Sequence, residues 1–434
     1  MSLRPRPAAR FAELRLFFWV VLLGFLGSVA VRAAAVGDFR ADAAALPAAL
    51  LALALTLHLV LVVFGSRGDQ LLLPLALALT AVGLVLVQRL APDRLFVLQL
   101  SWLVIAAGAF VATLLVPRDL TALSRYKWTW AFLGILLLLS PLFPVIGREI
   151  NGSRIWIGYG DLFNFQPSEA VKILLVVFFA AYLEEYREVI SSPRRLGPFP
   201  LPPVPYLVPI VLMWAMAMVV MVMEKDLGAT LLFFGIFLAM LYLATGQALY
   251  VLLGLAMFLL GAFAAYELFA HVQARVDTWL EPFAEEARFG PSFQLVQGLF
   301  ALGNGGLFGA GLGGGMPERI PVVWSDFVYA AFTEETGFLG GAALLALYLV
   351  FVFRGMTIAL RAPTPFLQLL AGGLAFIIAL QTLVIVAGNA KLIPLTGVTL
   401  PFVSYGGSSL VTNFIIVALL IRVSDITARA RGQP

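Results

Sequence analysis

The sequence predicts an all-α, polytopic integral membrane protein with about twelve transmembrane helices, and two observations lead to this class. Of the 434 residues, 62% are hydrophobic and 12% are charged, whereas soluble domains are about 45–50% apolar and about 25% charged. Apolar runs of about 20 residues, the length that crosses a bilayer, recur along the whole chain. The absence of cysteine excludes disulfides, iron–sulfur clusters and thiol catalysis, and the two histidines argue against a histidine-built metal site.

Twelve segments have the length and composition of a membrane span. They are residues 14–34, 43–64, 70–88, 95–116, 129–147, 168–185, 206–223, 226–245, 247–268, 328–353, 366–388 and 405–422. Lysine and arginine favour the connections on the side of the N-terminus, so the positive-inside rule predicts that both termini are cytoplasmic. The larger outside segments are then 148–167, 269–327 and 389–404. No segment resembles a separate soluble domain, so we expect residues 1–434 to form a single integral membrane domain.

A helix start with a charged pair follows the first of these outside segments. Pro167 and Ser168 are typical of a helix N-terminus, with Ser168 as the expected N-cap. Glu169 and Lys172 are three residues apart, so they lie on one face of that helix and can pair. An unpaired lysine would be costly within the membrane. A structural ion pair and a substrate contact both remain open for these two residues.

Three other polar stretches also have structural interpretations. Arg154 beside Trp156 fits an anchor at the membrane interface, where tryptophan is enriched. The charges in residues 224–230 fit best a hydrated turn that neutralises itself between two spans. Residues 400–409 combine proline, glycine and hydroxyl groups at the entrance of a span. That composition indicates a broken helix lining a cavity or, equally well, small residues at a helix contact.

The long polar segment from Ala270 to Tyr329 carries the strongest functional signal. Ten glycines lie between Gly290 and Gly315, and we interpret them as a mobile or re-entrant segment that closes over a substrate. They do not indicate a nucleotide-binding loop, because no βαβ unit surrounds them. Asp326 follows where the chain re-enters the bilayer, and desolvation there makes a functional carboxylate the favoured interpretation. Glu334 and Glu335 lie deeper in the apolar run, where they need partners or a cavity.

Several motifs follow one another in a fixed order over about residues 129–425. They are NGSRIW, FQPSEAVK, EKDLGAT, FQLVQGLFALGNGGLFGAGLG, IPVVWSDFVYAAFTEETGFLG and LPFVSYGGSS. In these motifs and their order the chain resembles the SEDS family, which includes RodA, FtsW and SpoVE. The resemblance implies a ten-helix core, so two of the spans near the N-terminus, within about residues 1–90, are additional, which favours a RodA-like member. The sequence departs from the family at Trp324-Ser325, where His-Thr is usual, and at Lys225, where Pro is usual.

The resemblance implies a peptidoglycan glycosyltransferase that polymerises lipid II, an undecaprenyl-diphosphate-linked disaccharide pentapeptide, into glycan strands. The expected location is the outer face of the bacterial cytoplasmic (inner) membrane, in cell elongation or division. Lipid II, membrane lipids and a class B penicillin-binding protein are the implied partners, and no nucleic acid is expected. By its motif, Asp326 matches the catalytic aspartate of the family. The predicted substrate-binding residues are Arg154, Trp156, Glu169, Lys172, Arg275, Gln294, Gln297, Arg319 and Ser404.

Inverting glycosyl transfer needs a base that takes a proton from the acceptor hydroxyl, and we expect Asp326 to be this base. A cation must also meet the departing diphosphate. Arg154, Arg275, Arg319 and Lys172 remain alternatives for this role, as does a divalent cation such as Mg²⁺ or Mn²⁺. Two other functions also remain open. A transporter that flips the lipid-linked precursor would suit the intramembrane charges and the broken helix, and a scaffold would activate a penicillin-binding protein without chemistry of its own.

Overall fold

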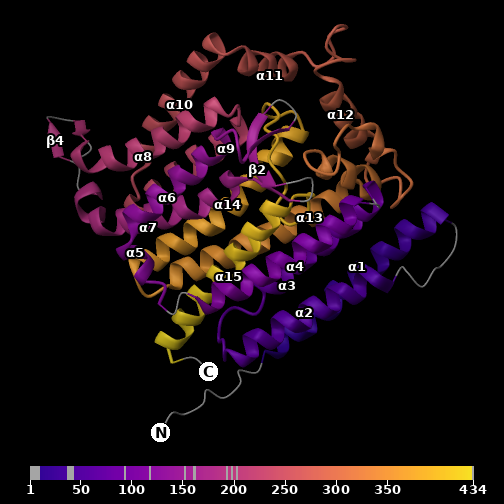
Figure 1. The fold of residues 1–434 in the computed structure, drawn as a ribbon, viewed down its shortest axis with the longest axis horizontal. Coiled ribbons are helices and arrows are strands. Elements are labelled where there is room, and N and C mark those ends of the chain that lie inside the picture. The colour runs from indigo at the N-terminus through magenta and orange to yellow at the C-terminus, as the bar shows by residue number, and fades with distance from the viewer. Residues whose placement is uncertain are drawn as a thin grey trace. The chain divides into compact units, whose positions relative to one another are not determined.

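The computed structural model describes residues 10–36, 44–91, 94–116, 119–150, 153–159, 163–191, 194–196, 199–201 and 204–432. The chain divides into two compact units. Figure 1 shows the helices and strands, coloured by residue number. Unit 1 comprises Met1–Val116, Asp277–Thr357 and Gln381–Pro434. Unit 2 comprises Pro117–Val276 and Ile358–Leu380.

Unit 1 is built from long apolar helices. Its complete helices are α1 (Phe11–Val36), α2 (Ala45–Val63), α3 (Leu72–Leu90), α4 (Arg94–Leu115), α12 (Phe293–Gly305) and α15 (Gly407–Ala430), with the 3₁₀ turn η3 (Pro317–Arg319). Helix α1 packs against α2 and α3, and α15 packs against α4, so these helices lie side by side (Figure 1). Three more helices have residues in both units, namely α11 (Ala270–Leu280), α13 (Val328–Arg361) and α14 (Pro365–Asn389).

Unit 2 combines apolar helices with two small antiparallel sheets. Its helices are α5 (Ala122–Arg125), α6 (Lys127–Leu139), α7 (Pro167–Ser191), α8 (Val204–Met223), α9 (Leu227–Thr245) and α10 (Ala248–Leu268), with the 3₁₀ turn η2 (Ser140–Leu142). The first sheet has the order β1 (Gly147–Ile150), β2 (Ser153–Tyr159), β3 (Phe163–Phe165). The second pairs β4 (Arg194–Leu196) with β5 (Phe199–Leu201). Helix α7 packs against α6 and α9 and buries the phenylalanines Phe178 and Phe179.

The predicted membrane class is confirmed, because each of the twelve predicted segments overlaps a helix. Nine helices among the described residues are long and apolar enough to cross a membrane. The apolar helices α6 and α8 are shorter over their apolar part, and α7 is not among the nine. The protein is therefore a multi-pass membrane protein, while the count of twelve spans stays a prediction.

Two of the predicted outside segments contain regular structure that the sequence did not predict. Within residues 269–327 lie α11, α12 and η3. The outside segment 148–167 contains most of the three-stranded sheet, which an all-α class does not include. Ile155 and Ile157 alternate with Arg154 and Trp156 along β2, and this mixture of β-branched and aromatic residues with a two-residue period favours a strand.

Candidate functional site

Asp326 lies in unit 1, two residues before α13 begins, and its side chain is half-buried. The Ser325 hydroxyl donates a hydrogen bond of 2.5 Å to Oδ1 of Asp326. A Cβ on Gly397 would lie 3.7 Å from Oδ2, and the φ of this glycine is +73°. The next residue, Phe327, is fully buried and packs in a small apolar cluster with Leu295 and other residues. The carboxylate therefore stands at the edge of a packed core, beside a residue without a side chain.

The backbone around Asp326 is held by the stretch from residue 389 to residue 405. Three consecutive carbonyl oxygens each accept one hydrogen bond from it: Trp324 from the Tyr405 N–H (2.8 Å), Ser325 from the Ser404 hydroxyl (2.6 Å) and Asp326 from the Asn389 side-chain amide (2.8 Å). Asn389 and Ser404 are both buried. Ser404 also accepts a hydrogen bond from the Leu400 N–H, so its hydroxyl is used in both directions. This geometry favours positioning of Asp326 over direct substrate contact by Ser404.

The residues between α14 and α15 are non-helical, and both interpretations of residues 400–409 stay open. Within this stretch, buried side chains satisfy the free backbone groups. The Gln381 amide donates to the Thr399 carbonyl oxygen (2.8 Å), and the Gly406 N–H donates to Oε1 of Gln99 (3.3 Å). The Thr399 hydroxyl donates to the Ser409 hydroxyl (2.9 Å). Irregular backbone within a membrane protein needs such internal partners, and here they fix the stretch that holds Asp326.

The glycine-rich segment is bonded to the start of α13, and its interpretation as a mobile or re-entrant cover stays a prediction. Helix α13 is broken at Gly337, whose φ is +73°. The carbonyl oxygens of Glu334 and Glu335 accept hydrogen bonds from Ala310 N–H (3.0 Å) and Gly311 N–H (2.9 Å), while the N–H groups of Phe338 and Leu339 donate to the Gly306 (2.9 Å) and Leu307 (3.2 Å) carbonyl oxygens. Segment 306–311 thus supplies the backbone partners that the broken helix lacks.

Glycine is required in this contact because the two backbones touch. A Cβ on Gly309 would lie 2.3 Å from the Glu335 carbonyl oxygen, and a Cβ on Gly337 would lie 2.4 Å from the Gly309 nitrogen. Glycine density here serves close packing. The expectation that the two buried glutamates need partners is confirmed for Glu335, which pairs with Arg89 at 3.1 Å. Oε1 of Glu334 lies 3.4 Å from the Met316 N–H, which donates to it.

Three predicted substrate-binding residues lie on or near α12 in unit 1. Gln294 donates to the Pro321 carbonyl oxygen (2.7 Å), which belongs to the turn before Trp324. Gln297 lies one helical turn further and is half-buried, and Arg319 is exposed on η3. Helix α12 approaches the segment that carries Asp326 closely, because a Cβ on Gly298 would lie 2.4 Å from the Phe327 ring. The roles of Gln294, Gln297 and Arg319 in substrate binding stay predictions.

In unit 2, Glu169 and Lys172 form the predicted pair. The Lys172 ammonium donates to Oε2 of Glu169 at 2.6 Å, and the two residues are 1% and 7% exposed, respectively. Helix α7 begins at Pro167, a residue suited to the first helical position because it lacks an N–H. Ser168 therefore lies in the first turn, and its expected role as N-cap was wrong.

The turn between α8 and α9 buries two acids, so the interpretation as a hydrated turn was also wrong. Glu224 is 3% exposed and Asp226 is 9% exposed. Asp226 caps α9, since its Oδ1 accepts from the Ala229 N–H (2.9 Å), and its Oδ2 accepts from the Gln166 amide (3.3 Å). Burial and the Asp226 charge raise the pKa of Glu224 to about 8. One feature of the sequence could have indicated this burial. The link between the two apolar helices has only three residues, so its side chains have little room to reach water.

Burial raises the pKa of Asp226 as well, against the opposing influence of the Ala229 N–H and of the Arg275 charge. Arg275, on α11, is thus close enough to Asp226 to act on it electrostatically. The Glu169 charge acts on Asp226 in the opposite direction, which places the acids of α7 and of the α8–α9 turn in one electrostatic cluster. The sequence indicated Glu169 and Arg275 separately. It did not predict that both charges act on the pKa of Asp226.

Arg154 and Trp156 share a face of the sheet in unit 2, because they are two residues apart on β2. Trp156 pairs directly with Arg148 of β1, so this second arginine lies on the same face. The Arg148 guanidinium donates to Oδ1 of Asn164 on β3 (3.4 Å). Sequence reasoning missed Arg148, because the strand pairing that brings it opposite Trp156 was not predicted. The face combines cationic and aromatic groups, as a binding surface for phosphates and sugars does.

Similarity to known proteins identifies the family of this chain. The profile of the FtsW/RodA/SpoVE family, described as cell cycle protein, matches residues 69–429. The chain belongs to this family. Peptidoglycan glycosyltransferase RodA of Mycobacterium tuberculosis is 38% identical over 435 residues, covering 97% of this chain and 91% of the relative. Stage V sporulation protein E of Bacillus subtilis is 33% identical over 378 residues, covering 83% of this chain and 97% of its own.

Solved structures of the family have the same fold. A chain from a peptidoglycan synthase complex aligns with a TM-score of 0.68 and 26% identity, covering 85% of this chain and 99% of that chain. The RodA of Thermus thermophilus aligns with a TM-score of 0.59, 26% identity and the same coverage. Helices α1 and α2 precede the residues that the family profile matches. The resemblance to the RodA, FtsW and SpoVE family is therefore confirmed.

A metal ion was one candidate for meeting the diphosphate. In the part of the chain that the structure describes, no three histidine, aspartate or glutamate side chains gather in a way that could hold a metal ion. The involvement of Mg²⁺ or Mn²⁺ stays a prediction.

Proposed function

We propose that this FtsW/RodA/SpoVE family member polymerises lipid II into glycan strands with Asp326 as the general base. The chain is a peptidoglycan glycosyltransferase by its family and by relatives of that name that align over 97% of its length. The reaction joins an acceptor sugar hydroxyl to the anomeric carbon of a lipid-linked donor. Asp326 takes the hydroxyl proton, the new glycosidic bond forms, and the donor's diphosphate leaves with its electron pair.

The observation that carries this assignment is the contrast between backbone and side chain at Asp326. Three successive carbonyl oxygens, including its own, are held by the 389–405 stretch, whereas the carboxylate itself is only half-buried. A general base must be fixed in position and must still reach the proton that it removes. Base assistance of this kind contributes about 10²–10⁴ in rate.

The departing diphosphate needs positive charge, and the predicted candidates differ in their surroundings. Arg154 lies on the same sheet face as Trp156, and Arg148 lies opposite Trp156 on that face. One ring and two guanidinium groups suit a sugar diphosphate. Lys172 already neutralises Glu169, and Arg275 acts on Asp226. Arg319 is exposed. These contacts favour Arg154 as the diphosphate ligand, with Lys172 and Arg275 organising the acidic cluster.

The partner and the location follow the same family argument. A solved structural neighbour comes from a peptidoglycan synthase complex whose description couples polymerization with crosslinking. This neighbour supports a crosslinking partner for the present chain, namely a class B penicillin-binding protein. The excess of lysine and arginine on the side of the N-terminus supports cytoplasmic termini in the inner membrane, with lipid II and Asp326 at the opposite face.

The test is the substitution Asp326→Asn in purified, partner-bound protein supplied with lipid II. We expect glycan polymerisation to fall at least about a hundredfold, because the amide cannot accept the proton. Asp277→Asn, the same change at an exposed carboxylate of α11, is the matched control and should polymerise normally.

Wild-type polymerisation by a folded Asp326→Asn protein would disprove the proposed base. This assay tests the transporter alternative, and a growth test of the same variant tests the scaffold alternative. A transporter for the lipid-linked precursor makes no glycan chains from lipid II in detergent. A scaffold without chemistry of its own would support growth with the Asp326→Asn change, provided that it still bound its partner.

A further inference from the structure

Helix α1 lies before the residues that the family profile matches, and it packs along one continuous seam. Six of its buried positions are spaced alternately by four and three residues, namely Glu13, Phe17, Val20, Gly24, Gly27 and Val31, and the buried Ser28 lies beside them. This spacing keeps one helix face against its neighbours over its whole length. A Cβ on Gly24 would lie 2.6 Å from Leu50 of α2, and a Cβ on Gly27 would lie 2.8 Å from Val85 of α3. The two glycines let α1 approach both helices closely.

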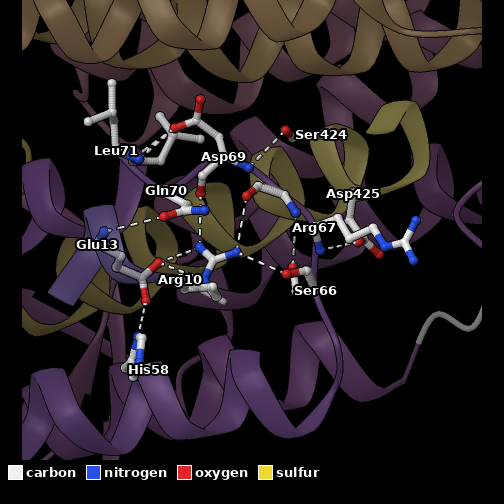
Figure 2. Close-up of polar contacts among 12 residues, drawn as sticks. Arg10, Glu13, His58, Ser66, Arg67, Asp69, Gln70, Leu71, Ser424 and Asp425 are labelled. Atoms are coloured by element: carbon white, nitrogen blue, oxygen red, sulfur yellow. Dashed lines mark hydrogen bonds and ion pairs between the residues drawn. The ribbon is translucent and has the colours of Figure 1, made fainter. Parts of the chain in front are cut away.

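The N-terminal end of α1 is fixed by a buried polar network. Figure 2 shows the Arg10 guanidinium between Glu13 and the loop that joins α2 to α3. Arg10 pairs with Glu13 (2.9 Å from Nε to Oε2) and donates to three loop carbonyl oxygens, those of Ser66 (3.2 Å), Gly68 (3.0 Å) and Asp69 (3.1 Å). His58 of α2 contacts the other oxygen of Glu13 through Nδ1 at 2.7 Å. Arg10 and Glu13 are 2% and 0% exposed.

The loop that holds Arg10 is itself attached to the family core. The Asp69 N–H donates to the Ser424 hydroxyl (2.9 Å), and the Arg67 N–H donates to Oδ1 of Asp425 (2.7 Å), both on α15 (Figure 2). The Asp69 carboxylate also accepts from Nε of Arg354 on α13 (3.0 Å). Through this loop the first turn of α1 is therefore fixed relative to α13 and α15.

The C-terminal end of α1 meets the glycine-rich segment. A Cβ on Gly313 would lie 2.4 Å from Cβ of Ala34, and Gly313 has a φ of +81°. Arg89, at the end of α3, donates to the Gly315 carbonyl oxygen (3.3 Å) and to Glu335 of α13 (3.1 Å). The segment that α1 touches is the one whose backbone completes the broken start of α13. Asp326 is separated from that helix by a single residue.

The polar network fixes the position of α1 along its axis more strictly than apolar packing alone would. An apolar seam in a membrane permits sliding, whereas a shift of one residue, about 1.5 Å along the axis, would break the bonds of Arg10 to three carbonyl oxygens. Burial of Arg10 and Glu13 is costly unless their partners are kept in place. The network therefore sets the axial register of α1, and the register determines where Ala34 meets Gly313.

We propose that α1 is a positioning element of the polymerase: held in register by Arg10 and Glu13, it supports the glycine-rich segment at Gly313 and through it the start of α13. This inference rests on the proposed role of Asp326. It assigns a function in catalysis to a helix outside the family core.

The test is Ala34→Leu, which adds bulk against Gly313, with Ala33→Leu as the matched control. Ala33 is the neighbouring residue on the same helix and is exposed like Ala34, but it is Ala34 that a Cβ on Gly313 would meet. We expect Ala34→Leu to lower kcat for lipid II polymerisation about tenfold, since small displacements of catalytic groups have such effects. KM for lipid II and the thermal midpoint should stay near wild type. Unchanged kcat, or an equal loss in the Ala33→Leu control, would overturn the proposal.

A second measurement covers the case in which Ala34→Leu does not fold. The chain has no cysteine, so the pair Ala34→Cys and Gly313→Cys gives a crosslink without background. A disulfide needs about 3.8 Å between Cβ atoms, which a small outward shift provides. Efficient oxidation in membranes supports the contact, and failure to crosslink in an active protein refutes it. Wild-type activity of Asp326→Asn would contradict the role of Asp326 as the base. It would not change the interpretation of either Ala34 experiment.

Discussion

Two acidic sites of this protein are held in opposite ways. At Asp326 in unit 1, three successive backbone carbonyl oxygens are bonded, one carboxylate oxygen accepts from the neighbouring Ser325 hydroxyl, and the residue stays partly exposed. At Asp226 in unit 2, the contacts fall on the side chain, where both carboxylate oxygens accept hydrogen bonds and the residue is 9% exposed. Glu224 beside it is more deeply buried still.

The difference indicates which acid can react. Both oxygens of the Asp226 carboxylate already accept hydrogen bonds, one from a helix N-terminus and one from a side-chain amide. Such a carboxylate is suited to organising its surroundings. A carboxylate on a fixed backbone that stays partly exposed can meet a substrate hydroxyl without large reorganisation. This comparison favours the proposal that unit 1 supplies the base and that the acids of unit 2 arrange the cations Lys172 and Arg275.

The largest loss of activity and stability is expected from changes at the buried pair of α7, which test the organising role of unit 2. Either Glu169→Ala or Lys172→Ala leaves one buried charge without its partner, which typically costs about 3–5 kcal/mol. We expect both single variants to lose most activity and thermal stability. The charge-swapped double variant, Glu169→Lys with Lys172→Glu, should recover a large part of both, as measured by lipid II polymerisation and by thermal unfolding.

The pair Lys127 and Glu185 provides the control, because Glu185 is exposed and Lys127 is only partly buried, so the same swap between α6 and α7 should change less. Equal damage in the swapped Glu169–Lys172 variant and in the single variants would show that each residue touches substrate individually. In that case the contrast between a reacting unit 1 and an organising unit 2 would fail.

A smaller effect is expected when the backbone at Asp326 is released. Ser404→Ala removes the hydroxyl that donates to the Ser325 carbonyl oxygen. We expect kcat to fall about tenfold through misplacement of the base, with KM for lipid II unchanged. Ser101→Ala is the control, because this exposed hydroxyl bonds only within α4. A raised KM with unchanged kcat would instead identify Ser404 as a substrate ligand.

Sequence predicted what depends on local spacing. The pairing of Glu169 with Lys172 follows from a separation of three residues on a helix, and the apolar segments follow from their length. The support of Asp326 was not predicted, because Asn389 and Ser404 are 63 and 79 residues from the carbonyl oxygens that they bind. Such bonds depend on tertiary packing, which no local pattern records.

The glycine-rich segment illustrates a second limit of local patterns. Glycine supplies both backbone freedom and close approach, and composition alone does not separate the two. The approach of Gly309 to Glu335 shows that close packing is one use made of it here. Likewise, the charges at Glu224 suggested water, whereas the short link between α8 and α9 keeps them buried.

The smallest effect concerns Glu224 and pH. Its pKa rises from 4.5 to about 8 on folding, so between these values the folded state holds a proton that the unfolded state has released. The free energy of unfolding should therefore fall as pH rises through this range and level off above it. Glu224→Gln, which stays neutral, should remove most of that fall, measured as the thermal midpoint in detergent between about pH 5 and about pH 9.

The exposed Glu188 of α7 offers the matched control, since Glu188→Gln should keep the wild-type pH dependence. A slope that remains in Glu224→Gln would belong to Asp226, whose pKa is also raised by burial. A slope as steep in Glu224→Gln as in the wild type would mean that Glu224 does not hold the extra proton of the folded state. The expected protonation of the buried Glu224 would then be wrong, and the comparison of the two acidic sites would rest on their hydrogen bonds alone.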